Sequence, residues 1–417
     1  MRFFVTCARG TEGPLRRELV NLRIRGPRGA EGGVSFDGRL DEALAVCLHS
    51  RVAMRVLLEL GDGPLIAENA DALYEGVRAL PWADHLSGDS TLAVSATVRD
   101  NQRLSHSGFA ALKVKDAIVD TLRERLGVRP NVDTTDPDVP IVLHLRGLEA
   151  RLFLDVSGEP LHRRGYRVAM TEAPLKENLA AAILHLCDAD PERPFLDPMA
   201  GSGTFAIEQA MRARNLAPGF NRHFAFERWP NQGHAAAWAR LREAASAAVL
   251  PQAPAPIFAR DISPEAVAAI RRNAAAAGVS NDIRCEVGSL ADLAPPAPTG
   301  TLLTNPPYGE RLPGDQAGDL GDDATPDDNR RLRPGPGARG PRRFDGPSHP
   351  RARSPRPDDL NGLYTELSAA LGRFSAWNLA VFSGNPLFSR IFLRKPAISH
   401  RLWNGPLETR LLVYRPR

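Results

Sequence analysis

Two short motifs in the C-terminal half of the chain combine residue types that could carry out group transfer. In the first, "FLDPMAGSGTFAIEQA", an apolar strand end is followed by Asp197 and then by a turn rich in glycine. Gly201 and Gly203 would let a ligand approach the backbone at the carboxyl end of a strand, where open α/β sheets bind their ligands. The turn is not G-x-G-x-x-G, because Phe205 and Ala206 follow it, and it is not a P-loop, because no lysine follows it.

The charge at this turn indicates which class of ligand it suits. A carboxylate directly before the turn, at Asp197, would repel a pyrophosphate and would favour a cation or an ammonium group. S-adenosylmethionine carries both, as a sulfonium and an α-amine, so it is the cofactor that the motif indicates. The alternative interpretation is a purely structural turn between a strand and a helix that begins near Thr204.

The second motif, "TNPPYGERL", follows a short apolar run and begins at Asn305. Pro306 and Pro307 fix their own φ angles and carry no N–H, and the residue before each proline is kept out of the α region. The Asn305 amide would therefore be held at a fixed angle beside the ring of Tyr308, which suits a planar ligand with an amine on its edge. The alternative is an ordinary strand-ending turn with a surface tyrosine.

Together the two motifs suggest transfer of a methyl group to the exocyclic amine of a nucleobase. The lone pair of such an amine is conjugated with the ring, which makes the nitrogen a poor nucleophile. Asn305 Oδ1 and the Pro306 carbonyl could accept its two hydrogens and direct the lone pair at the sulfonium methyl. Tyr308 could stack on the base once it has left its helix. Placing nitrogen and methyl in line would be most of the work.

A third candidate residue, Asp261, ends the next predicted strand in "FARDISPEAV". An acid at this place, past the first glycine turn, is where a pair of ribose hydroxyls would be held. The alternative role is an N-cap for the following helix. Ser263, directly before Pro264, is better placed for that role, so the ribose interpretation is preferred.

The elements that must position these residues follow from hydrophobic periodicity. From Phe195 onward, predicted strands and helices alternate, which is typical of a doubly wound, mostly parallel sheet. Asn305 would lie at the end of the fourth strand of this sheet, on the same edge as Gly201. Before this region, "APLKENLAAAILHL" predicts a helix opened by Pro174.

The chain before Gly158 is predicted to form a compact α+β region. A long helix in this region should stop at Gly127, and two strands should flank a turn at Arg146–Gly147. A different pattern runs from Pro313 to Asp359, which is rich in Gly, Pro, Asp and Arg and nearly free of apolar residues. Such a segment cannot bury enough surface to order itself, so a disordered insert is predicted at residues 313–359.

Composition narrows the class of protein. The chain has 417 residues, of which 43% are hydrophobic and 24% charged, as in soluble globular proteins of two or three domains. Its four cysteines are far apart and form no C-x-x-C, so neither a zinc site nor a disulfide framework is expected, and a cytoplasmic location fits. No signal peptide or membrane span is predicted. The net charge of +4 is only a weak indication of a polyanionic partner.

The motifs resemble those of a known family. "DPMAGSGTFAIEQA" with "TNPPYGERL" is similar to the class I S-adenosylmethionine-dependent methyltransferases that act on exocyclic amino groups. "LDVSGEPLHRRGYR", "APLKENLAAAIL" and "GFAALKVKDAIVDTL" resemble the RNA guanine-N2 methyltransferases with an N-terminal THUMP domain. Among these, the bacterial 23S rRNA (guanine-N2) enzymes are most alike, in a form with one methyltransferase domain. The resemblance covers nearly the whole chain except the predicted insert.

This resemblance implies a fold and a division of labour. The expected fold is α/β, a class I (Rossmann-like) methyltransferase sheet preceded by an α+β ferredoxin-like and THUMP region that binds RNA. The expected domains are a ferredoxin-like region at 1–55, a THUMP domain at 56–165 and a methyltransferase domain at 166–417. The implied partner is RNA, with 23S rRNA or a ribosome precursor as the implied substrate, and no metal or membrane is expected. The oligomeric state is left open.

The resemblance also implies roles for individual residues. The cofactor would be bound by Asp197, Met199, Ala200, Gly201, Gly203, Asp261, Ile262 and Ser289. Within this set, Asp197 and the two glycines would touch the methionine part, and Asp261 would hold the ribose. The target base would be held by Asn305, Pro306, Pro307 and Tyr308. Phosphate contacts would come from Lys113, Lys115, Arg163, Arg164 and Arg167.

One position departs from the family pattern. Ser289 stands where relatives often have an acid that faces the adenine amine. Ser289 itself, Asp292 or the backbone could replace that acid.

Three other functions compete with a 23S rRNA enzyme. A tRNA guanine-N2 methyltransferase would use the same catalytic parts. A DNA adenine methyltransferase also uses Asn-Pro-Pro-Tyr, although the N-terminal resemblance argues against it. A non-catalytic RNA-binding assembly factor would not need Asp197 and Asn305, which are both present.

Overall fold

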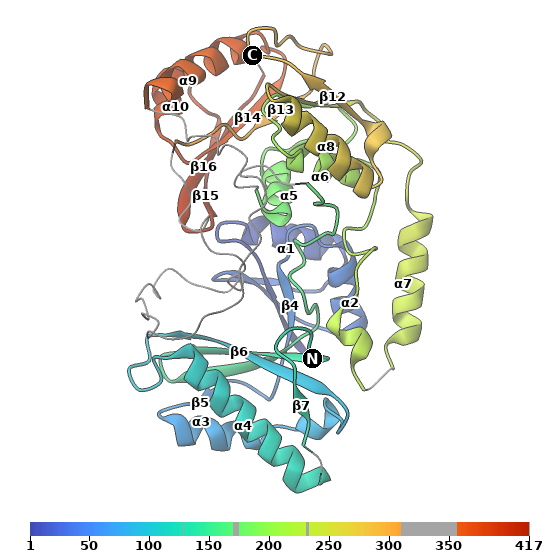
Figure 1. Ribbon diagram of the computed structural model, residues 1–417, viewed down its shortest axis with the longest axis vertical. Coiled ribbons are helices and arrows are strands. Elements are labelled where there is room, and N and C mark those ends of the chain that lie inside the picture. Colours follow the sequence, from blue (N-terminus) through green and yellow to red (C-terminus); the bar gives the residue numbers. More distant parts are fainter. Residues whose placement is uncertain (128, 170–174, 231–232, 310–356, 417) are drawn as a thin grey trace, which may run out of the picture.

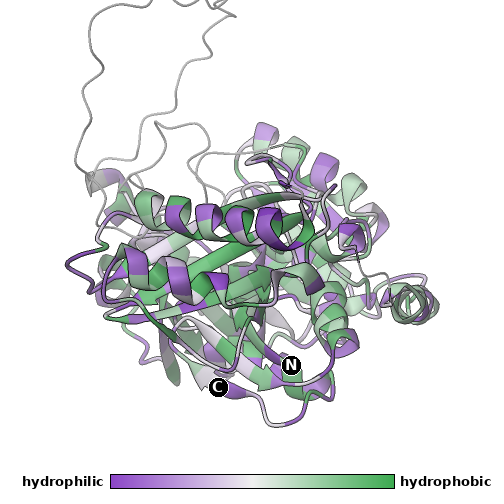
Figure 2. Cartoon of the chain, turned by 90° about the horizontal axis from the view of Figure 1, so that it is seen from below, coloured by the Kyte–Doolittle hydropathy of each residue, from purple (hydrophilic) through white to green (hydrophobic). Residues whose placement is uncertain are grey.

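The computed structural model describes residues 1–127, 129–169, 175–230, 233–309 and 357–416. These residues form two β-sheets, one in each half of the molecule (Figure 1). The methyltransferase-like half lies at the top of the view, the region around α4 lies at the bottom, and the N-terminal segment lies between them. Figure 2 shows mostly apolar strands between helices that carry both polar and apolar residues, as expected for packed α/β layers.

The first sheet has nine strands in the order β2-β3-β1-β4-β9-β8-β6-β7, with β5 paired to β9. The strands are β1 Arg2–Thr6, β2 Arg28–Ala30, β3 Gly33–Asp37, β4 Arg55–Glu59, β5 Leu65–Ile66, β6 Thr91–Arg99, β7 Asn131–Val132, β8 Val139–Arg146 and β9 Glu149–Asp155. Its helices are α1 Glu12–Asn21, α2 Leu40–His49, α3 Ala70–Arg78 and α4 Ser107–Leu126. As predicted, α4 ends at Gly127 and the β8–β9 turn contains Gly147.

A single strand joins the two N-terminal regions. β4 pairs antiparallel with β1 on one side and with β9 on the other. The predicted boundary between residues 55 and 56 therefore lies within a strand that both regions share. The ferredoxin-like and THUMP divisions stay predictions, but their backbones form one continuous sheet.

The second sheet has seven strands in the order β12-β11-β10-β13-β14-β16-β15. The strands are β10 Phe195–Asp197, β11 Ile257–Asp261, β12 Ile283–Val287, β13 Thr301–Thr304, β14 Asn378–Ser383, β15 Ile398–Asn404 and β16 Leu407–Tyr414. The helices are α5 Glu177–Leu186, α6 Thr204–Ala213, α7 Ala235–Ala247, α8 Pro264–Ala276, α9 Pro357–Gly372 and α10 Leu387–Ile391. β16 pairs antiparallel with both of its neighbours.

This topology confirms the predicted doubly wound, mostly parallel sheet. Its strand order reverses at β10, because β11 pairs on one side of β10 and β13 on the other. Doubly wound sheets bind ligands at such a switch point, outside the carboxyl ends of the strands.

Two predicted element boundaries differ from the structure. The helix predicted to open at Pro174 is α5, which begins at Glu177, and Pro174 lies outside the described residues. The predicted insert, 313–359, also lies outside them for residues 313–356. Its last three residues belong to α9, so the insert prediction extends too far toward the C-terminus.

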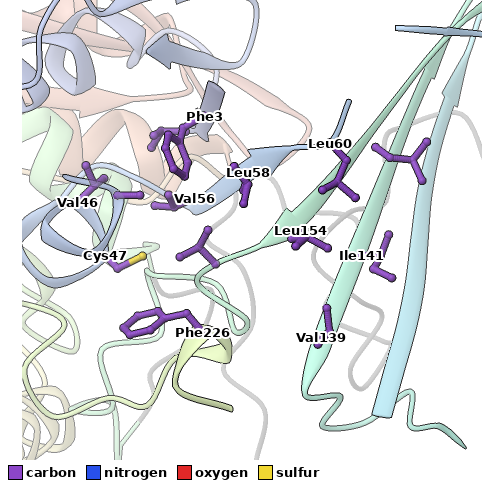
Figure 3. Packing of buried hydrophobic residues seen from close by; sticks show 14 of the residues in the cluster. Phe3, Val46, Cys47, Val56, Leu58, Leu60, Val139, Ile141, Leu154 and Phe226 are labelled. Carbon is purple, nitrogen blue, oxygen red and sulfur yellow. The ribbon is translucent and has the colours of Figure 1, made fainter. Parts of the chain in front are cut away.

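The two halves share one hydrophobic core. A segment of the C-terminal half, residues 217–245, contributes Phe226 and Trp238 to the cluster that also contains Cys47 and Val56. Figure 3 shows the Phe226 ring on the side of Cys47 and Val56. α7 packs against α2, and Gly219 N donates to the Leu48 carbonyl at 3.0 Å. The N-terminal half is therefore packed directly onto the methyltransferase-like half.

Candidate active site

The glycine turn lies at the switch point of the second sheet. As predicted, Asp197 ends β10 and α6 begins at Thr204; Gly203 is the N-cap of α6. Gly203 has a φ of 87°, in the left-handed region that favours glycine. A Cβ there would lie 2.9 Å from Ile270 Cγ2, so close packing against α8 also excludes a side chain.

Asp197 is almost fully buried within this turn. Its Oδ1 accepts a hydrogen bond from Met199 N at 3.2 Å. Burial, together with the nearby carboxylate of Asp261, raises the pKa of the Asp197 carboxyl to about 8. A buried carboxylate of this kind is stabilised by a bound cation, which fits the predicted contact with an ammonium group.

Asp261 connects the two loops that follow β10 and β11. Its Oδ2 accepts from Gly201 N at 2.9 Å, and its Oδ1 accepts from Ser263 N at 3.0 Å. Each carboxylate oxygen has a second lone pair that could accept from a ribose hydroxyl. Ser263 is confirmed as the N-cap of α8, since its Oγ accepts from Ala266 N at 3.1 Å. Asp261 is therefore not needed as the cap.

Apolar side chains are exposed at the ends of β11 and β12. Ile262 is 74% exposed and Val287 is 53% exposed. The strands are paired in register there, Asp261 with Val287, so the two side chains belong to one edge. Exposed apolar groups beside a ligand-binding edge suit the flat face of an adenine. Val287 was not predicted, although its position at a strand end in "EVGSL" was a signal.

Ser289, the residue that departs from the family pattern, is hydrogen-bonded to a nearby acid. Ser289 Oγ donates to Asp292 Oδ2 at 2.8 Å. Two of the alternatives for the adenine contact therefore form one unit, in which Ser289 holds a carboxylate close to this edge.

The Asn-Pro-Pro-Tyr motif directly follows β13, the fourth strand of this sheet, as predicted. The Tyr308 hydroxyl donates to Asn305 Oδ1 at 2.5 Å. Two residues from later in the chain hold the turn: Tyr364 donates to the Pro307 carbonyl at 2.7 Å, and Asn385 Nδ2 donates to the Tyr308 carbonyl at 2.9 Å. They follow 57 and 77 positions later, so no local sequence signal could have identified them.

The surroundings of Tyr308 define how its ring can be used. The ring packs edge-on against Phe382, with centroids 6.4 Å apart. A Cβ on Gly384 would lie 3.1 Å from Tyr308 Cδ2, so the missing side chain gives the ring its room. Burial raises the pKa of the Tyr308 hydroxyl far above its usual value, so the hydroxyl stays protonated and donates its hydrogen bond to Asn305 at neutral pH.

The glycine turn, Asp261 and the Asn-Pro-Pro-Tyr motif lie at the same edge of the second sheet. β11, β10 and β13 are neighbouring parallel strands, and Asp261, Asp197 and Asn305 lie at or just beyond their carboxyl ends. With strands about 4.8 Å apart, the three positions fall within roughly 10 Å across the sheet. That distance suits a nucleoside-sized cofactor next to a single base.

Comparison with known proteins agrees with this architecture. The RlmL ferredoxin-like domain matches residues 2–57, the THUMP domain matches residues 67–155, and the RMKL-like methyltransferase domain matches residues 164–320. The ribosomal RNA large subunit methyltransferase K/L of Syntrophotalea carbinolica is 39% identical over 429 residues. The match covers 99% of this chain and 53% of that protein, so the chain spans about half the length of this relative.

The chain belongs to the THUMP-domain methyltransferases. A protein named as a putative methyltransferase, solved in complex with S-adenosylhomocysteine (SAH), is 29% identical with a TM-score of 0.82, covering 100% of this chain and 98% of that one. A protein of Listeria monocytogenes, named as a predicted N6-adenine-specific DNA methylase, is 28% identical with a TM-score of 0.80, covering 100% and 96%. These likenesses confirm the predicted family and fold class.

Two of the arginines predicted to contact phosphate bind other groups of the protein instead. Arg164 is 5% exposed; its guanidinium donates to the carbonyls of Leu161 and Arg51, and its Nε lies 3.6 Å from Glu208 Oε1. The prediction that it contacts RNA is wrong in this structure, because the guanidinium is buried at the junction of the two halves.

Arg167 forms hydrogen bonds that hold the glycine turn in place. Its guanidinium donates to Glu177 Oε1 at 2.8 Å, Ser202 Oγ at 3.2 Å and Thr204 Oγ1 at 3.3 Å. It also donates to the Leu175 carbonyl at 2.9 Å. These bonds hold the start of α6 against α5, which is a positioning role that the sequence did not reveal.

The other three candidates are at least partly accessible. Arg163 lies 3.4 Å from Glu159 in an exposed ion pair. Lys113 Nζ lies 5.9 Å from the Phe109 ring centroid, and Lys115 Nζ lies 2.6 Å from Asp116 Oδ1. Their contact with RNA stays a prediction.

The described part of the chain contains neither a cluster of metal ligands nor a membrane-spanning helix. Within the five described ranges, no group of three or more His, Cys, Asp or Glu side chains could hold a metal ion. Among the helices of those same ranges, none is both long and apolar enough to cross a membrane.

Proposed function

We propose that the chain transfers a methyl group from S-adenosylmethionine to the exocyclic N2 amine of a guanine in RNA, with 23S rRNA as the substrate. The observation that carries the proposal is the Asn305 amide, which two prolines and the Tyr308 hydroxyl hold at the sheet edge beside Asp197. A planar, amine-bearing ligand and a cationic cofactor could meet at this edge.

The cofactor assignment is supported by the chemistry of the donor set. Asp197 offers a buried carboxylate to the α-amine, and Asp261 offers two carboxylate oxygens to the ribose hydroxyls. Ile262 and Val287 offer apolar surface to the adenine. The related structure that contains SAH covers 100% of this chain, which agrees with such a site.

The residues of the second motif would act on the target amine. Bound S-adenosylmethionine supplies an electrophilic methyl group. Asn305 Oδ1 has one lone pair taken by Tyr308 and one left for an amine hydrogen. The Pro306 carbonyl accepts no hydrogen bond from a described residue, so it could take the second hydrogen. Both bonds favour a pyramidal nitrogen with its lone pair directed at the methyl, and the proton lost after transfer can leave to water.

The RNA assignment is supported by the N-terminal half. A THUMP domain precedes the methyltransferase domain, and the relative from Syntrophotalea carbinolica is named as an enzyme of the large ribosomal RNA. A tRNA guanine-N2 methyltransferase is the closest alternative. The Listeria monocytogenes protein, with its name as a DNA methylase, keeps the DNA adenine alternative open to test.

Asn305→Ala tests the proposed chemistry. It should cut single-turnover methylation by roughly 10²–10³, the usual cost of one preorganised bond in the transition state, with little loss of cofactor affinity. Tyr308→Phe should cost several-fold in turnover, because the amide loses the hydroxyl that orients it. Asn361→Ala, at an exposed position of α9, is the matched control. Full activity of well-folded Asn305→Ala would disprove the proposed role.

A strain that lacks the gene tests the substrate. Nucleosides from its 23S rRNA and tRNA should be compared with those of the parent strain by mass spectrometry. Loss of one N2-methylguanosine from 23S rRNA is the expected result. Loss from tRNA alone would support the alternative, and no change in either RNA would contradict both.

A further inference from the structure

We propose that an arginine surface on α1 and the turn after it binds the phosphate backbone of the RNA substrate. This surface, the α1 arginine face, consists of Arg16, Arg17, Arg23 and Arg25. The inference rests on the proposed function for the identity of its partner. It replaces the buried Arg164 and the internally bonded Arg167 as the principal phosphate site.

The arginines are presented on one exposed face. Along α1, Gly13, Arg16, Arg17, Val20 and Asn21 are exposed at helical spacing, and the opposite side of the helix is buried. After α1 the chain reverses at Arg23, which has a φ of 63°, and the buried side chain of Ile24 anchors the turn.

The turn is tied back to the helix. Arg16 Nε donates to the Pro27 carbonyl at 3.1 Å. Arg23 and Arg25 are exposed on either side of the buried Ile24, so they project from the same end of α1. The four exposed arginines therefore lie within ten residues of the chain, on α1 and on the turn that is tied back to it.

The charge of this face is not neutralised within the described ranges. The sole acid between Pro14 and Ala30 is Glu18, which is buried and accepts from Ser50 Oγ at 2.6 Å and from the backbone of Arg51 and Val52. In the described part of the chain, none of the four arginines forms an ion pair within 4.0 Å. A cluster of uncompensated guanidinium groups suits phosphate, which arginine binds with two parallel hydrogen bonds.

A stacked pair connects this face to the methyltransferase sheet. The Arg9 guanidinium lies 4.2 Å from the centre of the Trp403 ring in β15. A Cβ on Gly10 would lie 2.6 Å from the Arg401 carbonyl, so the loop that leads into α1 touches this edge strand. Figure 1 shows the β15–β16 hairpin next to the N-terminal segment that contains α1.

The β15–β16 hairpin connects the α1 arginine face to the Asn-Pro-Pro-Tyr motif. Leu407, at the start of β16, has its Cδ2 2.8 Å from the position of a Cβ on Gly384. Gly384 in turn lies directly against the Tyr308 ring. β15 is three strands from β13, which corresponds to roughly 14 Å across the sheet. One RNA strand can therefore place a base at Tyr308 while its flanking phosphates reach Arg9 and the α1 arginine face.

The composition of the face favours RNA over a protein partner. Val20 is the one large apolar side chain of α1 that is strongly exposed in the described structure. Stable protein interfaces have a core of aromatic and apolar residues, which this face does not offer.

The test is a triple variant, Arg17→Gln, Arg23→Gln and Arg25→Gln, which leaves the Arg16 bond to Pro27 intact. The matched control, Arg193→Gln, Arg240→Gln and Arg272→Gln, removes the same three charges from exposed positions of the methyltransferase half. Binding of a 23S rRNA transcript is measured across a salt series. The magnitude of the slope of log K against log salt should fall by roughly 2–3 in the triple variant, at about 0.7–0.9 per lost phosphate contact, and by less than 1 in the control.

Other readouts distinguish the possible failures. The thermal midpoint and cofactor affinity of the triple variant should stay unchanged, because none of its residues touches the site. Equal slopes in the triple and control variants would overturn the proposal, as would competition by polyglutamate as strong as that by RNA. If the unaltered protein binds the transcript through this face but methylates no RNA, the proposed function fails while the binding surface stands.

Discussion

At the residue scale, two side chains of the candidate site have chemistry that depends on their neighbours. Asp197 is buried beside Asp261, and burial raises its pKa to about 8. Tyr308 is partly buried beside Phe382; its hydroxyl keeps its proton and donates a hydrogen bond to Asn305 Oδ1. Both residue types were recognised in the sequence, but the protonation of one and the partner of the other depend on other elements.

The raised pKa of Asp197 predicts a pH-dependent affinity for S-adenosylmethionine. An α-amine near pKa 7.8 stays charged up to about pH 7.5, whereas the carboxyl must lose its proton to bind it. Affinity should therefore rise by about tenfold per unit between pH 6 and pH 7.5, measured by isothermal titration. Asp197→Asn should bind weakly and without this dependence. An affinity that is flat in the unaltered protein would contradict the assignment.

The same carboxyl predicts how stability depends on pH without cofactor. The folded protein keeps this proton up to about pH 8, while the unfolded chain loses it near the ordinary value of 3.8. The folded state thus binds more protons between these values, so its stability should fall as pH rises through that window. In Asp197→Asn this part of the decline should be absent, which unfolding curves at several pH values can check.

At the element scale, the glycine turn shows how a strand and two helices produce a binding edge. β10 ends at Asp197, α6 begins at Thr204, and α8 packs so closely that Gly203 has no room for a side chain. Arg167, from the segment before α5, bonds both Ser202 and Thr204. The position of the turn therefore depends on α5, α6 and α8 together.

Gly203→Ala should destabilise the protein and weaken cofactor binding. The left-handed φ costs roughly 1–2 kcal/mol for a residue with a Cβ, and the contact with Ile270 adds to this cost. Gly278→Ala is the matched control, because Gly278 has a φ of 71° but nothing within 4 Å of a Cβ. Chemical unfolding and isothermal titration should show a larger stability loss, and a loss of cofactor affinity, only at Gly203. Equal effects at both positions would argue against packing at the turn.

At the scale of the whole molecule, the two halves form one structural unit. The segment at 217–245 leaves the methyltransferase sheet and packs on α2, β8 and the end of β9. Phe226 N donates to the Val156 carbonyl at 3.3 Å, and Arg228 donates to Asp136 at 2.8 and 2.9 Å. The N-terminal half is thus held at a set orientation to the candidate site, which suits the proposed substrate because that substrate must contact both.

Trp238→Ala tests whether the two halves unfold together. Trp238 packs edge-on against Phe224 and Phe226 at 5.5 and 5.1 Å, and its loss should cost about 3–5 kcal/mol. Hydrogen exchange in β4 and in β10 should report the same lowered unfolding midpoint, because the halves share a core. Leu250→Ala, just beyond α7 at a more exposed position, should have little effect. Separate midpoints for the two strands would show that the halves unfold independently.

The sequence by itself determined the features that depend on neighbours along the chain. The alternation of strands and helices, the turn before α6, the Ser263 cap and the rigid Asn-Pro-Pro-Tyr segment all follow from local backbone preferences. A parallel sheet then brings the carboxyl ends of β10, β11 and β13 to one edge, so the candidate site could be predicted from sequence order alone.

Only the tertiary structure decided which charged residues are available and which are used internally. Arg164 and Arg167 look like RNA contacts in the sequence, yet Glu208 and Glu177 engage them across the junction. The α1 arginines are left exposed because the acid among them, Glu18, is turned inward to Ser50. Tyr364 and Asn385 hold the Asn-Pro-Pro-Tyr motif from elements far along the chain. Such pairings depend on how distant segments pack together. Periodicity and local motifs carry no information about that packing.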